Sequence, residues 1–186
     1  MSFRSLLELD ARFSSQLRVA EKPGILRNFA AFLAHSGDSW FWAAALILAW
    51  FFSSSVWQQW EVVEFFGILG LAGVVLAIKF LVRRERPQGE WGGIYRNTDP
   101  HSFPSGHAAR AFLIAVVGAA LAPLWLAILL WVWAPLVSLA RVAMGVHYLS
   151  DVIAGAILGA IVGLIGLQIY PPMVAWLTTL IGFPLW

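Results

Sequence analysis

Two histidines and one aspartate are the residues of this chain best suited to making and breaking bonds. His147 and Asp151 are four residues apart, so the carboxylate can accept a hydrogen bond from one imidazole nitrogen while the other nitrogen stays free. Asp151 would then fix the tautomer of His147 and stabilise its imidazolium form, as a nucleophile requires. His107 is a second histidine, which can act as a general acid.

Basic side chains in the same part of the sequence are suited to binding an anion. Lys79, Arg83 and Arg86 are spaced i, i+4, i+7, which predicts one helical face. Ser105 and Gly106 are expected where a helix begins, and free backbone N–H groups at such a point bind anions. Cations and amides together suit a phosphate dianion. With the two histidines they predict phosphate-ester hydrolysis through a phosphohistidine.

The composition indicates that membrane-spanning helices position these residues. Of the 186 residues, 60% are hydrophobic and 12% are charged, whereas a soluble domain carries about 25% charge. The mean hydropathy is +0.78. This excludes an ordinary soluble globule, and a net charge of only +2 argues against binding to nucleic acid. The absence of cysteine excludes disulfides, iron–sulfur clusters and thiolate zinc sites.

Five apolar stretches are long enough to cross a bilayer, which requires about 20 residues. They are residues 40–57, 62–82, 104–122, 124–140 and 149–170. Pro171 and Pro172 are expected to end the fifth span. The apolar tail, residues 173–186, is expected to be a short sixth span or an interfacial helix. The predicted fold is therefore an all-α polytopic membrane bundle with five or six transmembrane helices.

Residues 1–35 have a different pattern from the membrane domain, residues 36–186. Apolar residues recur at helical spacing with arginines between them, which predicts an amphipathic helix on the membrane surface. Asp38 is expected to be the N-cap of the first span. On the fifth span, Gly155, Gly159 and Gly163 recur every four residues, which favours close helix contact inside the bundle or at a dimer face.

Alternation of the spans across the membrane brings the chemically active residues to one face. The end of the second span, the start of the third, the end of the fourth and the start of the fifth share that face. Ionisable groups are costly in hydrocarbon, so their presence there indicates a site or a water-filled cavity. The residues concerned are Lys79, Arg83, Arg84, Arg86, His107, Arg110, Arg141, His147 and Asp151.

At these residues the sequence resembles the type 2 phosphatidic acid phosphatases, also called lipid phosphate phosphatases. The three family motifs are matched by Lys79 with Arg86-Pro87, by Pro104–His107, and by Arg141 with His147 and Asp151. Ala140 stands where the third motif usually has serine, which removes one hydroxyl and leaves the reacting groups intact. The resemblance covers roughly residues 40–170.

The resemblance implies a role for each matched position. His147 would attack phosphorus and be oriented by Asp151, while His107 would protonate the leaving oxygen. The phosphate oxygens would be held by Lys79, Arg86, Ser105, the amide of Gly106, and Arg141. The family uses no metal, so no metal or other cofactor is expected. Candidate headgroup contacts on the same face are Tyr95, Arg96, His101 and Arg110, although a structural or solvated role is the simpler interpretation of each.

Other functions fit the residues less well. Two histidines in spans could ligate haem, but haem has no need of the neighbouring arginines. A non-enzymatic anion or lipid transporter is the main alternative, and basic residues on only one face argue against it. Vanadate-dependent haloperoxidases share the constellation but are soluble proteins. The expected partner is a membrane lipid phosphate, for which undecaprenyl diphosphate, phosphatidate, phosphatidylglycerophosphate and lipid A phosphates all fit the family.

The loop charges predict an orientation in the membrane. All 12 Lys and Arg residues are expected on the motif face or in spans close to it, and the opposite loops have none. By the positive-inside rule this favours a cytoplasmic site, although many family members act outside the cytoplasm. The small size suggests a prokaryotic cytoplasmic membrane. The oligomeric state is left open.

Overall fold

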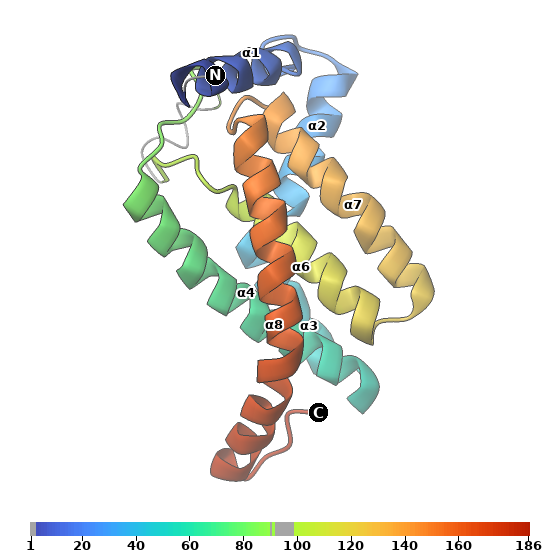
Figure 1. Cartoon of the computed structure of the whole chain (residues 1–186). Coiled ribbons are helices and arrows are strands. Elements are labelled where there is room, and N and C mark those ends of the chain that lie inside the picture. Colours follow the sequence, from blue (N-terminus) through green and yellow to red (C-terminus); the bar gives the residue numbers. More distant parts are fainter. Residues whose placement is uncertain (1–2, 90, 92–98) are drawn as a thin grey trace.

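All regular elements that the structure describes are helices. The computed structural model describes residues 3–89, 91 and 99–186. Its helices are α1 (Phe3–Gln16), α2 (Ile25–Ser36), α3 (Ser39–Trp50), α4 (Ser55–Val82), α6 (Gly106–Leu121), α7 (Leu124–Ala143) and α8 (Leu149–Ile181). In Figure 1, α6 lies among the other helices of the bundle and α1 lies across one end of it.

Three of these helices, α4, α7 and α8, are long and apolar enough to cross a membrane. The apolar helices α3 and α6 are shorter, with 12 and 16 residues. Large apolar side chains on the outside of the bundle remain exposed, as at Leu76, Leu124 and Leu164. Apolar side chains directed outward suit a lipid environment, so the prediction of a helical membrane bundle holds in this coarser form.

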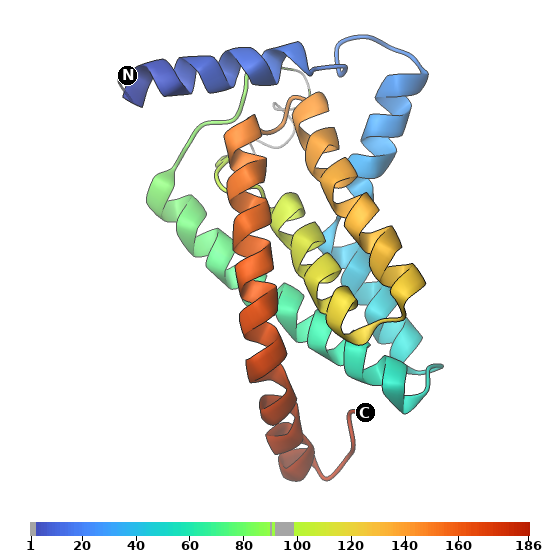
Figure 2. The same ribbon diagram turned by 45° about the vertical axis from the view of Figure 1, so that its right-hand side comes forward.

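The helices α2 and α3 follow one another and are separated by Gly37 and Asp38. α2 begins near the end of α1, and α3 ends at the opposite end of the molecule (Figure 2). Ala30 and Ala34 of α2 pack with Ala140 of α7, which ties α2 to the bundle. The break between α2 and α3 exposes backbone groups that must find partners in the protein.

Small residues allow α8 to lie directly against α6. A Cβ atom at Gly159 would overlap the backbone of Ala109, and one at Gly155 would overlap the carbonyl oxygen of Ser105. Both glycines are buried. Of the two predicted uses of this glycine pattern, the structure therefore supports packing inside the bundle.

Several expected helix boundaries were wrong. The first span ends at Trp50 rather than Trp57, and the second begins at Ser55 rather than Val62. α8 continues through Pro171 and Pro172 as one helix of 33 residues. Prolines remove main-chain hydrogen bonds, but membrane helices tolerate them because the freed carbonyls find other partners.

The tail predicted as a separate element is therefore mostly the end of α8. Gly182 ends the helix in a left-handed conformation with φ of 68°. The chain then turns back to α3, where the indole of Trp50 donates a hydrogen bond to the carbonyl of Leu185 at 2.7 Å. These contacts hold the last residues against the bundle at the end opposite α1 (Figure 1).

Candidate active site

The predicted site residues gather at the end of the bundle that α1 covers. Here α4 and α7 end, and α6 and α8 begin. The amide of Ser105, before α6, donates to the carbonyl of Asp151 in α8 at 3.0 Å. Nη1 of Arg86, after α4, donates to the carbonyl of Val146, after α7, at 2.8 Å. The expected convergence of four distant segments therefore occurs in the structure.

His147 and Asp151 face one another at the start of α8. His147 precedes the helix and Asp151 lies in its first turn, so the pair meets across a helix start rather than along one helical face. Nδ1 of His147 lies 3.6 Å from Oδ2 of Asp151. Both side chains are almost fully buried. The backbone N–H of Tyr148 donates to the same carboxylate oxygen at 2.9 Å and holds it in place.

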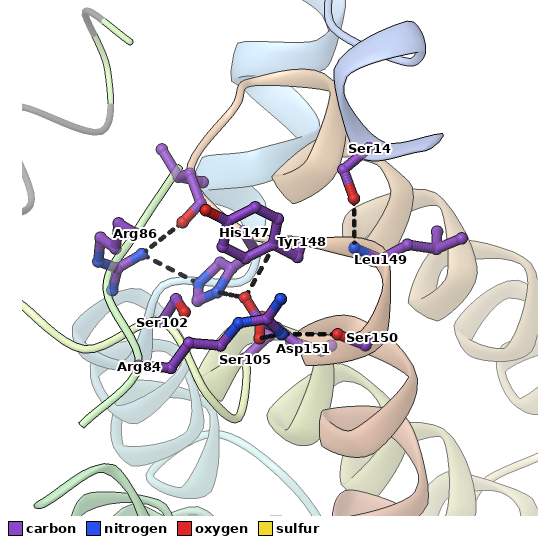
Figure 3. Close-up of polar contacts among 12 residues, drawn as sticks. Ser14, Arg84, Arg86, Ser102, Ser105, His147, Tyr148, Leu149, Ser150 and Asp151 are labelled. Carbon is purple, nitrogen blue, oxygen red and sulfur yellow. Dashed lines mark hydrogen bonds and ion pairs between the residues drawn. The ribbon is translucent and has the colours of Figure 1, made fainter. Parts of the chain in front are cut away.

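The second nitrogen of His147 faces a cation. Its Nε2 lies 3.2 Å from Nη1 of Arg86, and Figure 3 shows the imidazole between Arg86 and Asp151. Arginine can only donate, so Nε2 is the acceptor and carries a lone pair. The proton of the neutral ring is then on Nδ1, beside Asp151. This is the tautomer that a nucleophilic Nε2 requires.

Lys79 and Arg86 meet at the carboxylate of Asp99. The ammonium group of Lys79 bonds to Oδ2 of Asp99. Nη2 of Arg86 donates to that oxygen at 2.7 Å, and its Nε donates to the carbonyl of Asp99 at 2.6 Å. The two cations are therefore spaced to hold one small anion.

The predicted common face of Lys79, Arg83 and Arg86 was wrong. α4 ends at Val82, and Arg83 adopts a left-handed conformation with φ of 52°. The exposed side chain of Arg83 returns to the carbonyl of Phe80 at 2.9 Å. Only the extended segment after the helix brings Arg86 back to Lys79.

His107 is paired with Asp38 from the break between α2 and α3. Nε2 of His107 lies 2.6 Å from Oδ1 of Asp38, and Nδ1 of His35 lies 3.3 Å from Oδ2. Asp38 stands at the predicted N-cap position of α3, but its side chain makes no capping bond. One carboxylate therefore contacts two histidines, His107 through Oδ1 and His35 through Oδ2.

The remaining predicted phosphate ligands surround these pairs. Ser105 is the N-cap of α6, and its hydroxyl accepts from the N–H of Ala108 at 3.4 Å. Gly106 begins the helix. Arg141 lies in the last turn of α7 and is 2% exposed. Arg110 is also buried, and its guanidinium donates to the carbonyl of Gly37 in the break between α2 and α3.

A cavity of about 320 Å³ joins the two histidines. Its polar wall is formed by Ser39, Lys79, Asp99, His101, Gly106, His107, Arg110 and His147. Its apolar wall is formed mainly by one face of α4, with Ile68, Leu71, Ala72, Val75 and Leu76. One side of the cavity therefore suits an anion and the other, larger side suits a hydrocarbon.

The surroundings of His147 favour its neutral form. Burial lowers the pKa of His147 well below its usual value of 6.5, and the positive charges of Arg86, Arg141 and Lys79 lower it further. Both effects disfavour a second positive charge in the same place. The imidazole of His147 is therefore expected to be unprotonated at neutral pH, the form that a nucleophile requires.

The candidate headgroup residues fall into two groups. His101 and Arg110 line the cavity, whereas Tyr95 and Arg96 lie outside the described residues. Sequence reasoning missed Asp38 and Asp99, which bind predicted site residues. Their sequence signal is weak, since each is a single carboxylate between apolar or irregular segments with no spacing that links it to a histidine or lysine.

Comparison with known proteins identifies the family to which the sequence is similar. The sequence model of the PAP2 superfamily matches residues 60–174. The decaprenylphosphoryl-5-phosphoribose phosphatase of Mycobacterium tuberculosis is 32% identical over 160 residues, which cover 85% of this chain and 88% of the relative.

Two solved structures share the fold. The PAP2-type phosphatidylglycerolphosphate phosphatase of Bacillus subtilis aligns with a TM-score of 0.72 and 22% identity, over 90% of this chain and 87% of the other. LpxE of Aquifex aeolicus aligns with a TM-score of 0.67 and 27% identity, over 87% and 94% of the two chains.

Proposed function

Because the chain belongs to the PAP2 superfamily, we propose that it is an integral-membrane phosphatase. It removes a phosphate monoester or diphosphate group from a membrane lipid through a phosphohistidine, without a metal. The observation that carries this proposal is the shape of one cavity. One wall of it carries both histidines with basic side chains, and the other wall carries apolar side chains of α4. A lipid phosphate matches these two walls, because it has an anionic phosphate at one end and a hydrocarbon chain at the other.

The first step transfers the phosphoryl group to the protein. Nε2 of His147 attacks phosphorus, the bond from phosphorus to the ester oxygen breaks, and that oxygen takes a proton from His107. Asp151 orients the ring of His147 and stabilises the positive charge that develops on it. The phosphate oxygens take the place of Nε2 as acceptors of the Arg86 N–H, which frees the lone pair for attack.

The second step releases inorganic phosphate. A water molecule gives a proton to His107 and attacks phosphorus, the phosphorus–nitrogen bond breaks, and His147 returns to its neutral form. Asp38 holds the ring of His107 in both steps through its 2.6 Å contact. Its negative charge also offsets the positive charges of Arg110 and Arg141 beside His107.

Protein side chains supply the positive charge that the reaction requires. Lys79, Arg86, Arg110 and Arg141 are all buried around the histidines. Cations aimed at the phosphoryl oxygens stabilise a transition state in which negative charge spreads over those oxygens. Activity that persists in a chelator such as EDTA is therefore expected.

The carboxylate of Asp99 occupies the cation pair that a phosphate would use. It bonds to both Lys79 and Arg86 and is itself 40% exposed. A phosphate dianion carries more charge and more oxygens than one carboxylate, so it competes well for both cations. Substrate binding then displaces Asp99 toward solvent.

The apolar wall of the cavity indicates that the substrate is a lipid. The relative from Mycobacterium tuberculosis is named for a decaprenylphosphoryl sugar phosphate, and the Bacillus subtilis structure for phosphatidylglycerolphosphate. Both names describe a phosphate ester at the polar end of a long hydrocarbon. We therefore place phosphates of polyprenyl carriers and of glycerolipids first among the substrates of this chain.

The site lies at one surface of the membrane in this proposal. The broken pair α2–α3 together with α4, α6, α7 and α8 makes five crossings, and α1 lies flat on the surface with Leu6 and Phe13 exposed. The distribution of arginine and lysine favours a prokaryotic cytoplasmic membrane with the site on the cytoplasmic face.

Phosphate release in detergent tests the proposal. The panel contains undecaprenyl diphosphate, phosphatidate, phosphatidylglycerophosphate and a lipid A phosphate, with glycerol 3-phosphate as a control that lacks a hydrocarbon chain. Release from at least one lipid, in the presence of EDTA, is expected for the natural chain and not for His147→Ala. Binding of these lipids without any phosphate release would instead indicate a non-enzymatic transporter and overturn the proposal.

A further inference from the structure

Arg84 contacts the aspartate that orients the nucleophile in the proposed reaction, although it is not one of the residues that define the three motifs. Its Nη1 donates to Oδ1 of Asp151 at 2.7 Å and to the hydroxyl of Ser150 at 2.6 Å. The guanidinium also lies over the ring of Tyr148, 4.1 Å from its centroid. Asp151 is fully buried, and a buried carboxylate needs a paired cation and hydrogen bonds. Arg84 supplies both on the side away from His147.

The other end of the Arg84 side chain is held by the N-terminal helix. Nη2 of Arg84 donates to Oδ2 of Asp10 in α1 at 2.7 Å. The hydroxyl of Ser150 bonds to the same oxygen of Asp10. One guanidinium therefore bridges two carboxylates, one on α1 and one in the active site.

α1 also caps the first amides of α8, beside the bond from the N–H of Tyr148 to Asp151. Tyr148 stands at the N-cap position of α8, and its side chain is not one of the short polar groups that usually cap a helix. The first two free amides of the helix are instead satisfied from α1. The N–H of Leu149 donates to Oγ of Ser14 at 2.8 Å, and the N–H of Ser150 donates to Oδ1 of Asp10 at 3.1 Å (Figure 3 shows the contact of Ser14).

The segment after α1, at Arg18 and Val19, makes hydrogen bonds to the loops beside His147. Arg18 donates to the carbonyl of Gln88 at 2.7 Å, and the N–H of Val19 donates to the carbonyl of Ala143 at 2.9 Å. Gln88 follows the motif arginine, and Ala143 ends α7. The N-terminal segment thus contacts the elements that carry Arg86, His147 and Asp151 on their outer side.

We propose that Arg84 and Asp10 are positioning residues for Asp151, so that α1 forms part of the catalytic architecture of this phosphatase. The contacts reach the nucleophile in three links, from Asp10 to Arg84, from Arg84 to Asp151 and from Asp151 to His147. Without Arg84 in place, Oδ1 of Asp151 loses its ion pair and only Oδ2 stays held, by the N–H of Tyr148, so the carboxylate can turn relative to Nδ1 of His147. This inference rests on the proposed phosphohistidine reaction and extends it to a helix that carries no motif residue.

Positioning predicts a kinetic effect that differs from substrate binding. Arg84 and Asp10 are not among the residues that line the cavity, so their removal is expected to leave KM within about twofold. The coupling energies usual within one network correspond to a change in rate of roughly 2- to 150-fold. We therefore expect Arg84→Gln to lower kcat by that range and to slow phosphoenzyme formation in a single turnover equally.

The chain offers matched controls for the variants at Arg84 and Ser14. Arg83→Gln removes an exposed arginine one residue away, and Ser15→Ala removes an exposed hydroxyl beside Ser14. Neither should alter kcat by more than about twofold, whereas Ser14→Ala should lower it. Arg84→Lys keeps the charge but cannot bridge both carboxylates, so it should restore part of the kcat lost in Arg84→Gln.

Asp10→Asn tests the same link with little change of shape. Its side-chain oxygen can still accept from Ser150, but the ion pair with Arg84 is lost, so kcat should fall with the midpoint of thermal unfolding nearly unchanged. A rise in KM at constant kcat for Arg84→Gln, or kcat values equal to those of the controls for Asp10→Asn and Arg84→Gln, would overturn the inference. Absence of phosphate release by the natural chain would instead refute the proposed function.

Discussion

In the proposed reaction, the imidazole of His147 must be neutral although basic side chains surround it. His147 has Asp151 at one ring nitrogen and Arg86 at the other, and this arrangement sets which nitrogen can attack. His107 has its own carboxylate, Asp38. Each histidine is thus oriented by a different aspartate, which suits a pair that must act as nucleophile and acid in the same step.

The pKa of His147 predicts the acid limb of the pH profile. Only the neutral ring attacks, so activity falls as the pH drops through that pKa, which burial and the neighbouring cations hold below 6.5. The acid limb of kcat/KM, which reports the free enzyme, should lie below pH 6.5. Because the unfolded chain protonates this histidine at higher pH, His147 also stabilises the fold above about pH 6.5, and this stabilisation is lost on acidification.

The measurement must separate the limb of the enzyme from that of the substrate. The phosphate group of a monoester substrate also titrates in this range, with a second pKa of about 6. The pH profile of kcat/KM is therefore measured with two substrates whose phosphates differ in their second pKa. A limb caused by the enzyme stays at the same pH with both substrates, whereas a limb caused by the substrate moves. An enzyme limb above pH 6.5 would contradict a nucleophile surrounded by cations.

The pairing of His107 with Asp38 predicts a dependence on the leaving group. A general acid matters most when the departing oxygen is strongly basic. His107→Ala should therefore lower kcat by about 10²- to 10⁴-fold on an alkyl lipid phosphate and much less on p-nitrophenyl phosphate. Asp38→Asn should show the same selectivity with a smaller loss. Equal losses on both substrates would argue against proton donation by His107.

At the scale of the helices, close contact between α6 and α8 places the two halves of the site together. Gly155 and Gly159 let the backbones approach, and the amide of Ser105 reaches the carbonyl of Asp151. The start of α6 and the start of α8 then open on the same cavity. Distance between these helices is therefore set by glycine positions a turn or more away from the chemistry.

A methyl group at Gly159 tests this contact. Gly159→Ala should lower the free energy of unfolding by roughly 1–3 kcal/mol, the usual cost of overpacking, because the new Cβ would overlap the backbone of Ala109. Gly73→Ala on α4 is the control, since nothing lies within 4 Å of its Cβ position. Thermal unfolding in detergent measures both. Equal midpoints for the two variants would show that α6 and α8 are not held this closely.

The sequence predicts some of these elements well and others poorly for physical reasons. Hydropathy locates α4, α7 and α8 because each is apolar and at least about as long as a bilayer crossing needs. Hydropathy does not reveal that α2 ends directly before α3, because Gly37 and Asp38 look like the start of a span. Motif spacing identifies His107 and His147, but the contacts of Arg84 with Asp10 join positions 74 residues apart with no periodic signal.

At the scale of the whole molecule, the two ends of the bundle differ in charge. The cations of the site and of the N-terminal segment gather at the end that α1 covers, and the C-terminus lies at the other end (Figure 1). The end of the bundle that α1 covers therefore carries the basic side chains and the candidate site. It is also the basis for the proposed orientation.

Labelling of introduced cysteines tests the orientation, and the natural chain contributes no background because it has no cysteine. Gln16→Cys at the end of α1 and Phe183→Cys beyond α8 are both exposed. In intact bacterial cells an impermeant maleimide should label position 183 alone, and position 16 only after permeabilisation. The reverse pattern would place the site outside the cytoplasm, and labelling of both from one side would contradict an odd number of crossings.

The phosphohistidine is the central claim, and trapping it is the most direct measurement. The protein is mixed with a lipid phosphate that it hydrolyses, quenched in alkali because phosphohistidine is labile in acid, and digested for mass spectrometry. We expect one phosphoryl group on the peptide that carries His147, formed by the natural chain and absent from His147→Ala. Phosphate release without a phosphorylated peptide, a phosphoryl group on another residue, or full turnover by His147→Ala would contradict the account.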